Sequence, residues 1–238
     1  LLEKGASIDA VNSYGETALI RAAIWGQVEI AQLLLSYGAD LNCTDNDGNT
    51  PLAWSIRQGH PELTELLINA GARVYPHDKY NRTALVLAAF SGHPEVVELL
   101  LDRGAEIEAR DSHGNTALIA ATKTGDLESI NLLLERGADI NATDTRLGCS
   151  ALFWAIANSS LEIVEILLSR GANPHLRNFS GTTPLFWAAF KGNFRITELL
   201  LNLGANPNSR NRYGFTPLML AARSGNKKIL ELLISRGA

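Results

Sequence analysis

A Gly-Ala pair recurs along the whole chain at a nearly constant spacing. It begins at residues 5, 38, 71, 104, 137, 171, 204 and 237, so that every step is 33 residues except one of 34. A fixed period of this size is typical of an array of small units, each burying its apolar face against its neighbours. We therefore expect residues 1–238 to form a single array of units at about 5–37, 38–70, 71–103, 104–136, 137–170, 171–203 and 204–236.

Each copy has the pattern of two short helices. A threonine or serine precedes the first apolar run, where its side chain would accept a hydrogen bond from an unpaired backbone N–H as an N-cap; these residues are Thr17, Thr50, Thr83, Thr116, Ser150, Thr183 and Thr216. Glycine ends that helix in every copy except one, which has Ser159. In the fourth copy Leu127, Ile130, Leu133 and Leu134 then form a helical apolar stripe.

Short motifs recur at fixed places in these copies. They include GNTPL at 48–52, GTTPL at 181–185 and GADIN at 137–141. With two helices and a turn in each 33 residues, the whole chain resembles the ankyrin repeat family. The resemblance implies an all-α solenoid of stacked helix-turn-helix units with β-hairpin-like loops. The histidine of the family's TPLH motif is absent, and we expect apolar packing to replace it at Ile20, Ala53, Val86, Ile119, Phe153, Phe186 and Met219.

Composition and cysteine positions indicate the cellular compartment of the chain. No apolar run approaches the roughly 18–20 residues that span a bilayer, and there is no targeting peptide in the sequence. Cys43 and Cys149 are three copies apart, too far for a disulfide if copies stack at about 8–10 Å. This favours a reducing, intracellular compartment, cytoplasmic or nuclear. Because both ends fall inside a copy, we expect a segment of a longer protein, monomeric as a segment.

The sequence predicts no enzyme and no cofactor. It lacks a dinucleotide-binding glycine motif, a P-loop, G-x-S-x-G and H-E-x-x-H. His77 and His113 fall on neighbouring turns but have no third ligand, so we expect no metal site. His60 and His93 occupy the Gly-His position common in ankyrin repeats and are expected to be structural.

One face of the first helices carries the best candidates for partner binding. Positions four, seven and eight after the cap share a face, and the family resemblance implies that partners bind there, in a concave groove. All four tryptophans of the chain fall on these positions. Aromatic side chains with arginines around them are typical of interaction hot spots. We call this set the first-helix row: Trp25, Trp54, Arg57, Phe90, Lys123, Trp154, Trp187 and Phe190.

Two alternatives remain open for residues singled out by pattern. Trp54, Trp154 and Trp187 stand at the first of the three positions, which is often a packed leucine in ankyrin repeats, so they serve either contact or packing. Asn42 and Asn141 resemble the asparagines that ankyrin domains offer to asparaginyl hydroxylases, but a side chain that hydrogen-bonds the turn is sufficient to explain them.

The turns form a second candidate surface, and the fifth carries the extra residue, around Thr145 to Leu147. Charge along the chain is uneven: residues 1–165 hold 11 basic and 23 acidic residues, and residues 166–238 hold 10 and 2. This indicates an acidic partner or ligand for the last two copies. We call the exposed candidates the turn-tip set: Tyr14, Tyr80, Arg177, Phe179, Arg210, Arg212, Tyr213 and Phe215.

The function predicted from these patterns is protein binding through the groove and the turn tips. An alternative within the same fold is a structural or autoinhibitory spacer that packs on other domains of its own chain. A second alternative is binding of an anionic ligand, nucleic acid or a lipid headgroup, by the basic last two copies. A sequence pI of 5.8 and the lack of a nucleic-acid-binding module disfavour nucleic acid.

Overall fold

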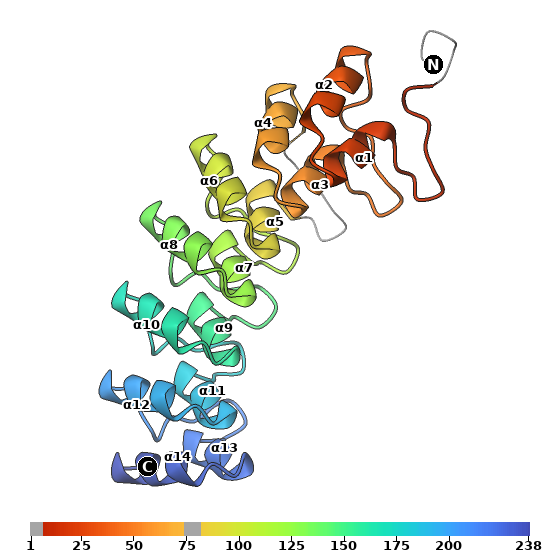
Figure 1. The fold of residues 1–238 in the computed structure, drawn as a ribbon. Helices are drawn as coiled ribbons and strands as arrows, with labels where there is room; N and C mark the ends of the chain where they lie inside the picture. Colours follow the sequence, from red (N-terminus) through yellow and green to blue (C-terminus); the bar gives the residue numbers. More distant parts are fainter. Residues whose placement is uncertain (1–6, 74–81) are drawn as a thin grey trace. The chain divides into compact units, whose positions relative to one another are not determined.

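The computed structural model describes residues 7–73 and 82–238, in two compact units, Leu1–Gly137 and Ala138–Ala238. Short helices follow one another in pairs within each unit (Figure 1). The helices of the first unit are α1 (Ala18–Ile24), α2 (Val28–Ser36), α3 (Pro51–Arg57), α4 (Pro61–Asn69), α5 (Ala84–Ser91), α6 (Pro94–Asp102), α7 (Ala117–Thr124) and α8 (Leu127–Glu135). Those of the second are α9 (Ala151–Ala157), α10 (Leu161–Ser169), α11 (Pro184–Lys191), α12 (Phe194–Asn202), α13 (Pro217–Arg223) and α14 (Lys227–Ser235).

Each unit consists of two layers of helices. In the first unit α1, α3, α5 and α7 pack in order as one layer and α2, α4, α6 and α8 as the other. The second unit repeats this with α9, α11 and α13 against α10, α12 and α14. The two layers bury the apolar stripes between them, as expected for an array of amphipathic helix pairs. The all-α solenoid class predicted from the period is confirmed.

The third position of each first helix lies in this core. Six of the seven residues there are at most 1% exposed, which confirms the expected apolar packing for Ile20, Ala53, Val86, Ile119, Phe153 and Phe186. Met219 is 48% exposed. It lies on α13, which has a first-layer neighbour on one side only, but so does α1, whose Ile20 is 0% exposed. One-sided packing therefore does not by itself explain the exposure of Met219.

The predicted helix caps are confirmed in five of seven copies. The side chains of Thr17, Thr50, Thr83, Thr116 and Thr216 each accept from the amide three residues on. The prediction is wrong at Ser150 and Thr183, whose side chains accept no capping bond. At Thr183 the expected donor, the amide of Phe186, bonds instead to the Thr183 carbonyl oxygen at 3.0 Å. Nothing in the structure explains the missing bond at Ser150.

The loops between copies are hairpin-like, as the sequence indicated. In the second copy the amide of Asp45 donates to the carbonyl of Asn49 at 3.1 Å, and in the fifth Asp144 donates to Cys149 at 3.0 Å. The fifth turn thus holds its extra residue inside the tip. Within the described part of the chain, its Thr143–Ser150 pair is the one β-bridge.

Two histidines join neighbouring copies. The ring nitrogen Nε2 of His60 lies 3.2 Å from the carbonyl oxygen of Ile24, and that of His93 lies 3.0 Å from the carbonyl oxygen of Arg57. A Cβ at Gly26 would lie 2.7 Å from the His60 ring, so the glycine is required for this approach as well as for its positive φ. The structural role predicted for both histidines is confirmed.

Ser159 ends α9 with a φ of 57°, a conformation that the other copies assign to glycine. A side chain in this left-handed region costs roughly 1–2 kcal/mol. We expect Ser159→Gly to raise the free energy of unfolding by about 1 kcal/mol, because part of the gain is lost to the greater freedom of glycine in the unfolded chain. Urea denaturation followed by circular dichroism measures the change.

The matched control for this substitution is Gly125→Ala. Gly125 ends α7 at φ 83°, and a Cβ built there meets nothing within 4 Å, so the variant introduces backbone strain without a clash. We expect Gly125→Ala to lower the free energy of unfolding by about 1 kcal/mol. A loss at Gly125 without a gain at Ser159 would show that Ser159 is not strained.

Candidate partner-binding surface

Three aromatic residues of the first-helix row project into solvent. Trp25 is 63% exposed, Phe90 47% and Phe190 44%. Each has an arginine over its ring: Arg21 lies 5.8 Å from the centroid of Trp25, Arg82 4.5 Å from Phe90 and Arg223 5.9 Å from Phe190. A cation within about 6 Å of a ring face is attracted to it. An arginine thus lies over an exposed aromatic ring in three copies, although Arg82 itself is buried, at 8% exposure.

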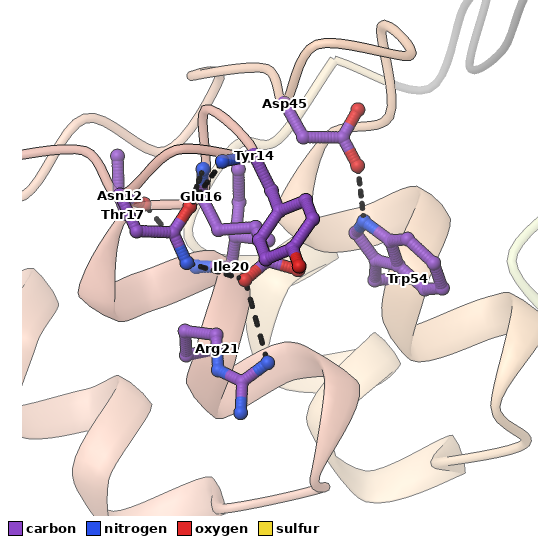
Figure 2. A network of polar contacts seen from close by, with 8 residues as sticks. All are labelled: Asn12, Tyr14, Glu16, Thr17, Ile20, Arg21, Asp45 and Trp54. Atoms are coloured by element: carbon purple, nitrogen blue, oxygen red, sulfur yellow. Dashed lines mark hydrogen bonds and ion pairs between the residues drawn. The ribbon is translucent and has the colours of Figure 1, made fainter.

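Two other tryptophans of the row are fixed by aspartates that sequence analysis missed. The indole nitrogen Nε1 of Trp54 donates to Oδ2 of Asp45 at 2.8 Å, as Figure 2 shows, and that of Trp154 donates to Oδ2 of Asp144 at 3.0 Å. Both aspartates begin a turn. An aspartate at the start of a turn, nine or ten residues before a tryptophan, is the signal that could have revealed this pair.

The third of these tryptophans packs against other rings. Trp187 lies edge-on to Phe153, with centroids 6.0 Å apart, and edge-on to Trp154 at 6.4 Å. Such T-shaped pairs are a favoured aromatic geometry. Trp54, Trp154 and Trp187 are half-buried. These contacts support the packing alternative for all three.

The cations of the row are attached to the turns. Arg57 lies 5.2 Å from the ring centroid of Trp54 and donates to Oδ1 of Asn49 at 3.1 Å. Lys123 makes the equivalent hydrogen bond to the side-chain oxygen of Asn115. Both amides are buried, at 3% and 8% exposure. The turn therefore holds the cation in place on the first helix.

A polar network positions the exposed face of the first copy (Figure 2). Glu16 accepts from the side-chain amide of Asn12 at 2.7 Å and from Arg21 at 3.3 Å. Oδ1 of Asn12 in turn accepts the amides of Tyr14 and Glu16 at 2.9 and 3.0 Å. The network fixes the turn backbone at Tyr14, a residue of the turn-tip set that is 71% exposed.

Asp45 is the acceptor at the centre of its turn. Partial burial alone would raise its pKa, but hydrogen bonds from the side chain and amide of Asn49, the indole of Trp54 and the amide of Asp47 outweigh burial and hold the pKa of Asp45 below its usual range. The charged form is therefore favoured in the folded state.

This depressed pKa predicts a stability that depends on pH. A group whose pKa is lower folded than unfolded stabilises fully above its unfolded pKa, about 3.9 for Asp, and loses that contribution as pH falls through the folded value. We expect the difference in melting temperature between the wild type and Asp45→Asn to be constant from pH 7 to 5 and to shrink below pH 4. Glu29→Gln, an exposed carboxylate on α2, is the control. An unchanged difference down to pH 3 would contradict the assignment.

The turn-tip set is exposed wherever the structure describes it. Tyr213 is 74% exposed, Phe179 53% and Phe215 43%. Arg177, Arg210 and Arg212 are exposed as well, and Arg177 donates to the carbonyls of Gly181 and Arg210 at 2.8 and 2.9 Å. Tyr80 lies outside the described residues.

Backbone bonds tie neighbouring tips together. The amide of Arg212 donates to the carbonyl of Ser180 at 3.0 Å, and that of Phe179 donates to Leu147 at 2.9 Å. These tips are therefore fixed platforms for their exposed side chains.

A hollow of about 440 Å³ opens between α11 and α13. Its lining joins apolar side chains to two cations and contains no carboxylate: Thr182, Phe186, Trp187, Phe190, Lys191, Leu220 and Arg223. Two members, Trp187 and Phe190, belong to the first-helix row. Leu220 and Arg223 stand four and seven residues after the cap Thr216, on the same helix face as the first-helix row, but spacing does not predict that the side chains leave a hollow.

The described residues show neither the pattern of a metal site nor that of a membrane span. Among residues 7–73 and 82–238 no three histidine, cysteine, aspartate or glutamate side chains form a group that could hold a metal ion; His77 lies outside them. In that same part no helix is long and apolar enough to cross a membrane. Neither Cys43 nor Cys149 forms a disulfide. Burial, assisted by nearby Asp40 and Asp9, raises the pKa of Cys43, which opposes thiolate formation.

Asn42 and Asn141 have a structural role in the fold. Oδ1 of Asn42 accepts the amide of Arg73 at 3.0 Å, and Oδ1 of Asn141 accepts the amide of Asn173 at 2.9 Å. Each bond joins one copy to the next. Hydrogen bonding therefore accounts for both asparagines.

Comparison with known proteins decides the family. Models described as "Ankyrin repeats (3 copies)" match residues 38–111, 75–144, 111–178 and 152–238, and one described as "Ankyrin repeats (many copies)" matches residues 1–54. The chain belongs to the ankyrin repeat family. Ankyrin repeats generally act as protein-interaction modules and not as enzymes.

A solved ankyrin structure is similar over nearly the whole array. It is the ankyrin repeat domain of Bcl-3, described as a unique member of the IkappaB protein family. Its sequence is 35% identical to this chain, and the two structures match with a TM-score of 0.78. The match covers 92% of this chain and 99% of the Bcl-3 chain. A comparison with curated proteins gave no significant match.

Proposed function

We propose that this ankyrin array binds a segment of a partner protein in the groove beside its first helices and at its turn tips. The observation that supports the proposal is the recurrence of an exposed aromatic ring with an arginine over it: Trp25 with Arg21, Phe90 with the buried Arg82, and Phe190 with Arg223. Trp, Tyr and Arg are the residues enriched at interaction hot spots. Exposed apolar side chains with polar groups around them commonly mark sites of protein–protein interaction.

The surface is suited to binding because it is already ordered. The cations Arg57 and Lys123 donate hydrogen bonds to turn asparagines, and the indoles of Trp54 and Trp154 donate to two aspartates. A partner segment would meet side chains that have little conformational entropy left to lose. Within the row, Trp25, Phe90 and Phe190 would supply the direct contacts, and the three half-buried tryptophans would support them.

The test compares capture from a cell extract by the wild type and by a Trp25→Ala, Phe90→Ala, Phe190→Ala variant. The control replaces three exposed apolar residues of second helices, Ile30, Leu33 and Ile234, which are 49%, 53% and 58% exposed. Circular dichroism confirms that all three proteins are folded. We expect a partner that is retained by the control and lost by the first-helix variant, with affinity lowered at least 100-fold when the isolated partner is titrated.

The other outcomes separate the alternatives. Equal capture by all three proteins would overturn the groove assignment. Loss in the control alone would place binding on the second helices. Absence of any captured protein would favour a spacer that packs on other domains of its own chain.

A further inference from the structure

In the last two copies the cations of the first helices and turns have no carboxylate beside them within the described residues. Residues 166–238 contain only Glu198 and Glu231 as acidic residues. Both lie on second helices and each faces its own cation, Arg195 at 3.4 Å and Lys227 at 3.7 Å. The first helices and turns of these copies carry five cations and no acid: Arg177, Lys191, Arg210, Arg212 and Arg223. Within the described residues none of the five pairs with a carboxylate.

Apolar surface lies directly beside two of these cations. The hollow between α11 and α13 is lined by the rings of Trp187 and Phe190, by Leu220, and by the cations Lys191 and Arg223. Phe190 and Lys191 are adjacent in sequence, and the guanidinium of Arg223 lies 5.9 Å from the Phe190 ring. Further apolar side chains on the same copies, Phe215 and Met219, are 43% and 48% exposed.

Cations beside an apolar hollow favour an anionic ligand that also carries a bulky apolar group. A bulky aliphatic or aromatic side chain fills an apolar hollow of about 440 Å³, and carboxylates on either side of it reach the cations. An acidic peptide supplies both. A long polyanion would instead experience the net charge of −4 and the acid-rich residues 1–165.

We propose that the hollow between α11 and α13 is the docking site for an acidic segment of a partner protein, which inserts one bulky apolar side chain between Phe190 and Leu220 and places its carboxylates against Lys191 and Arg223. This inference rests on the proposed function and adds the chemistry of the partner to it. The exposed arginines of the neighbouring turns extend the same basic surface.

The probe is a fluorescein-labelled peptide of alternating leucine and aspartate or glutamate, titrated with the whole chain by fluorescence anisotropy. A second peptide has glutamine and asparagine at all acidic positions. We expect the acidic peptide to bind at least tenfold more tightly than the neutral one. Lys191→Gln with Arg223→Gln should weaken it at least tenfold, and Phe190→Ala should do the same at unchanged protein charge.

The matched control is Arg195→Gln with Lys228→Gln, which removes the same charge from the second helices α12 and α14. We expect it to change peptide affinity less than twofold. An equal loss in this control would overturn the proposal, because it would show attraction to the overall charge and not docking in the hollow. A Phe190→Ala variant that binds normally would also overturn it.

Two further measurements distinguish the acidic peptide from other anionic ligands, and this inference from the proposed function. Single-stranded DNA and phosphatidylserine vesicles are titrated in the same way. If either binds more tightly than the acidic peptide, and Phe190→Ala does not change that binding, the ligand of this surface is that polyanion or membrane surface and the peptide proposal is overturned. Failure of the acidic peptide to bind, while the exposed aromatics still capture a partner from extract, would overturn this inference and leave the proposed function standing.

Discussion

Replacing Phe153 with alanine is expected to lower the free energy of unfolding by about 3–5 kcal/mol. Its ring is 0% exposed, at the third position of α9, and meets the indole of Trp187 edge-on with an interplanar angle of 81°. Truncation removes the transfer free energy of the ring and leaves a cavity that two layers of helices cannot fully close. The loss should be measured by urea denaturation followed through tryptophan fluorescence and circular dichroism.

Phe153→Leu is the matched control, because it keeps most of the apolar volume. We expect it to cost less than half as much as the alanine variant. A further expectation concerns Trp187, whose fluorescence should change in the alanine variant because its ring contact is lost. If Phe153→Ala cost under about 1 kcal/mol, the site would have to collapse around the cavity, contrary to the close packing described for this core.

Asp144→Ala is expected to cost about 2–4 kcal/mol. The carboxylate is 2% exposed and accepts three hydrogen bonds, from the amides of Leu147 and Gly148 at 2.6 and 3.1 Å and from the indole of Trp154 at 3.0 Å. Bonds to charged groups contribute roughly 1.5–3 kcal/mol each and are not additive, and the donors left behind would be buried and unsatisfied. Thermal and urea unfolding both report the loss.

Two comparisons test the reason for this cost. Asp45→Ala removes the corresponding carboxylate of the second copy, which is less buried, so we expect a smaller loss. Trp154→Phe removes the indole donor but keeps an aromatic ring, and should cost less than Asp144→Ala because the turn amides remain satisfied. If Asp144→Ala and Trp154→Phe cost the same, the turn amides would contribute nothing.

The fold could be predicted from the sequence because its determinants are local and repeated. A 33-residue period, a threonine cap such as Thr50 and a glycine such as Gly125 specify one helix pair, and seven repetitions reinforce each assignment. The capping rule failed at Thr183, where the Phe186 amide bonds to the backbone carbonyl oxygen of the cap, and at Ser150, where the structure shows no reason.

The surface was less predictable because exposure depends on rotamers and on contacts between copies. Trp25 and Trp54 lie on the same helix face, at the eighth and the fourth position after the cap, and Trp25 projects into solvent whereas Trp54 bonds to Asp45. The sequence position allowed packing at Trp54, but it did not reveal the aspartate that accepts from the indole. The hollow beside Phe190 likewise results from how the side chains of two helices pack, which spacing along the chain does not specify.

The asparagine bonds between copies bear on how such a chain can change in evolution. Asn42 and Asn141 each accept a hydrogen bond from a backbone amide of the next copy, 31 and 32 residues further on. Duplication of a whole copy reproduces the donor and the acceptor together, whereas a residue gained within a helix would shift one past the other. The one extra residue that the chain carries lies in the tip closed by Asp144 and Cys149. Such an array therefore lengthens by whole copies and tolerates single insertions at its hairpin tips.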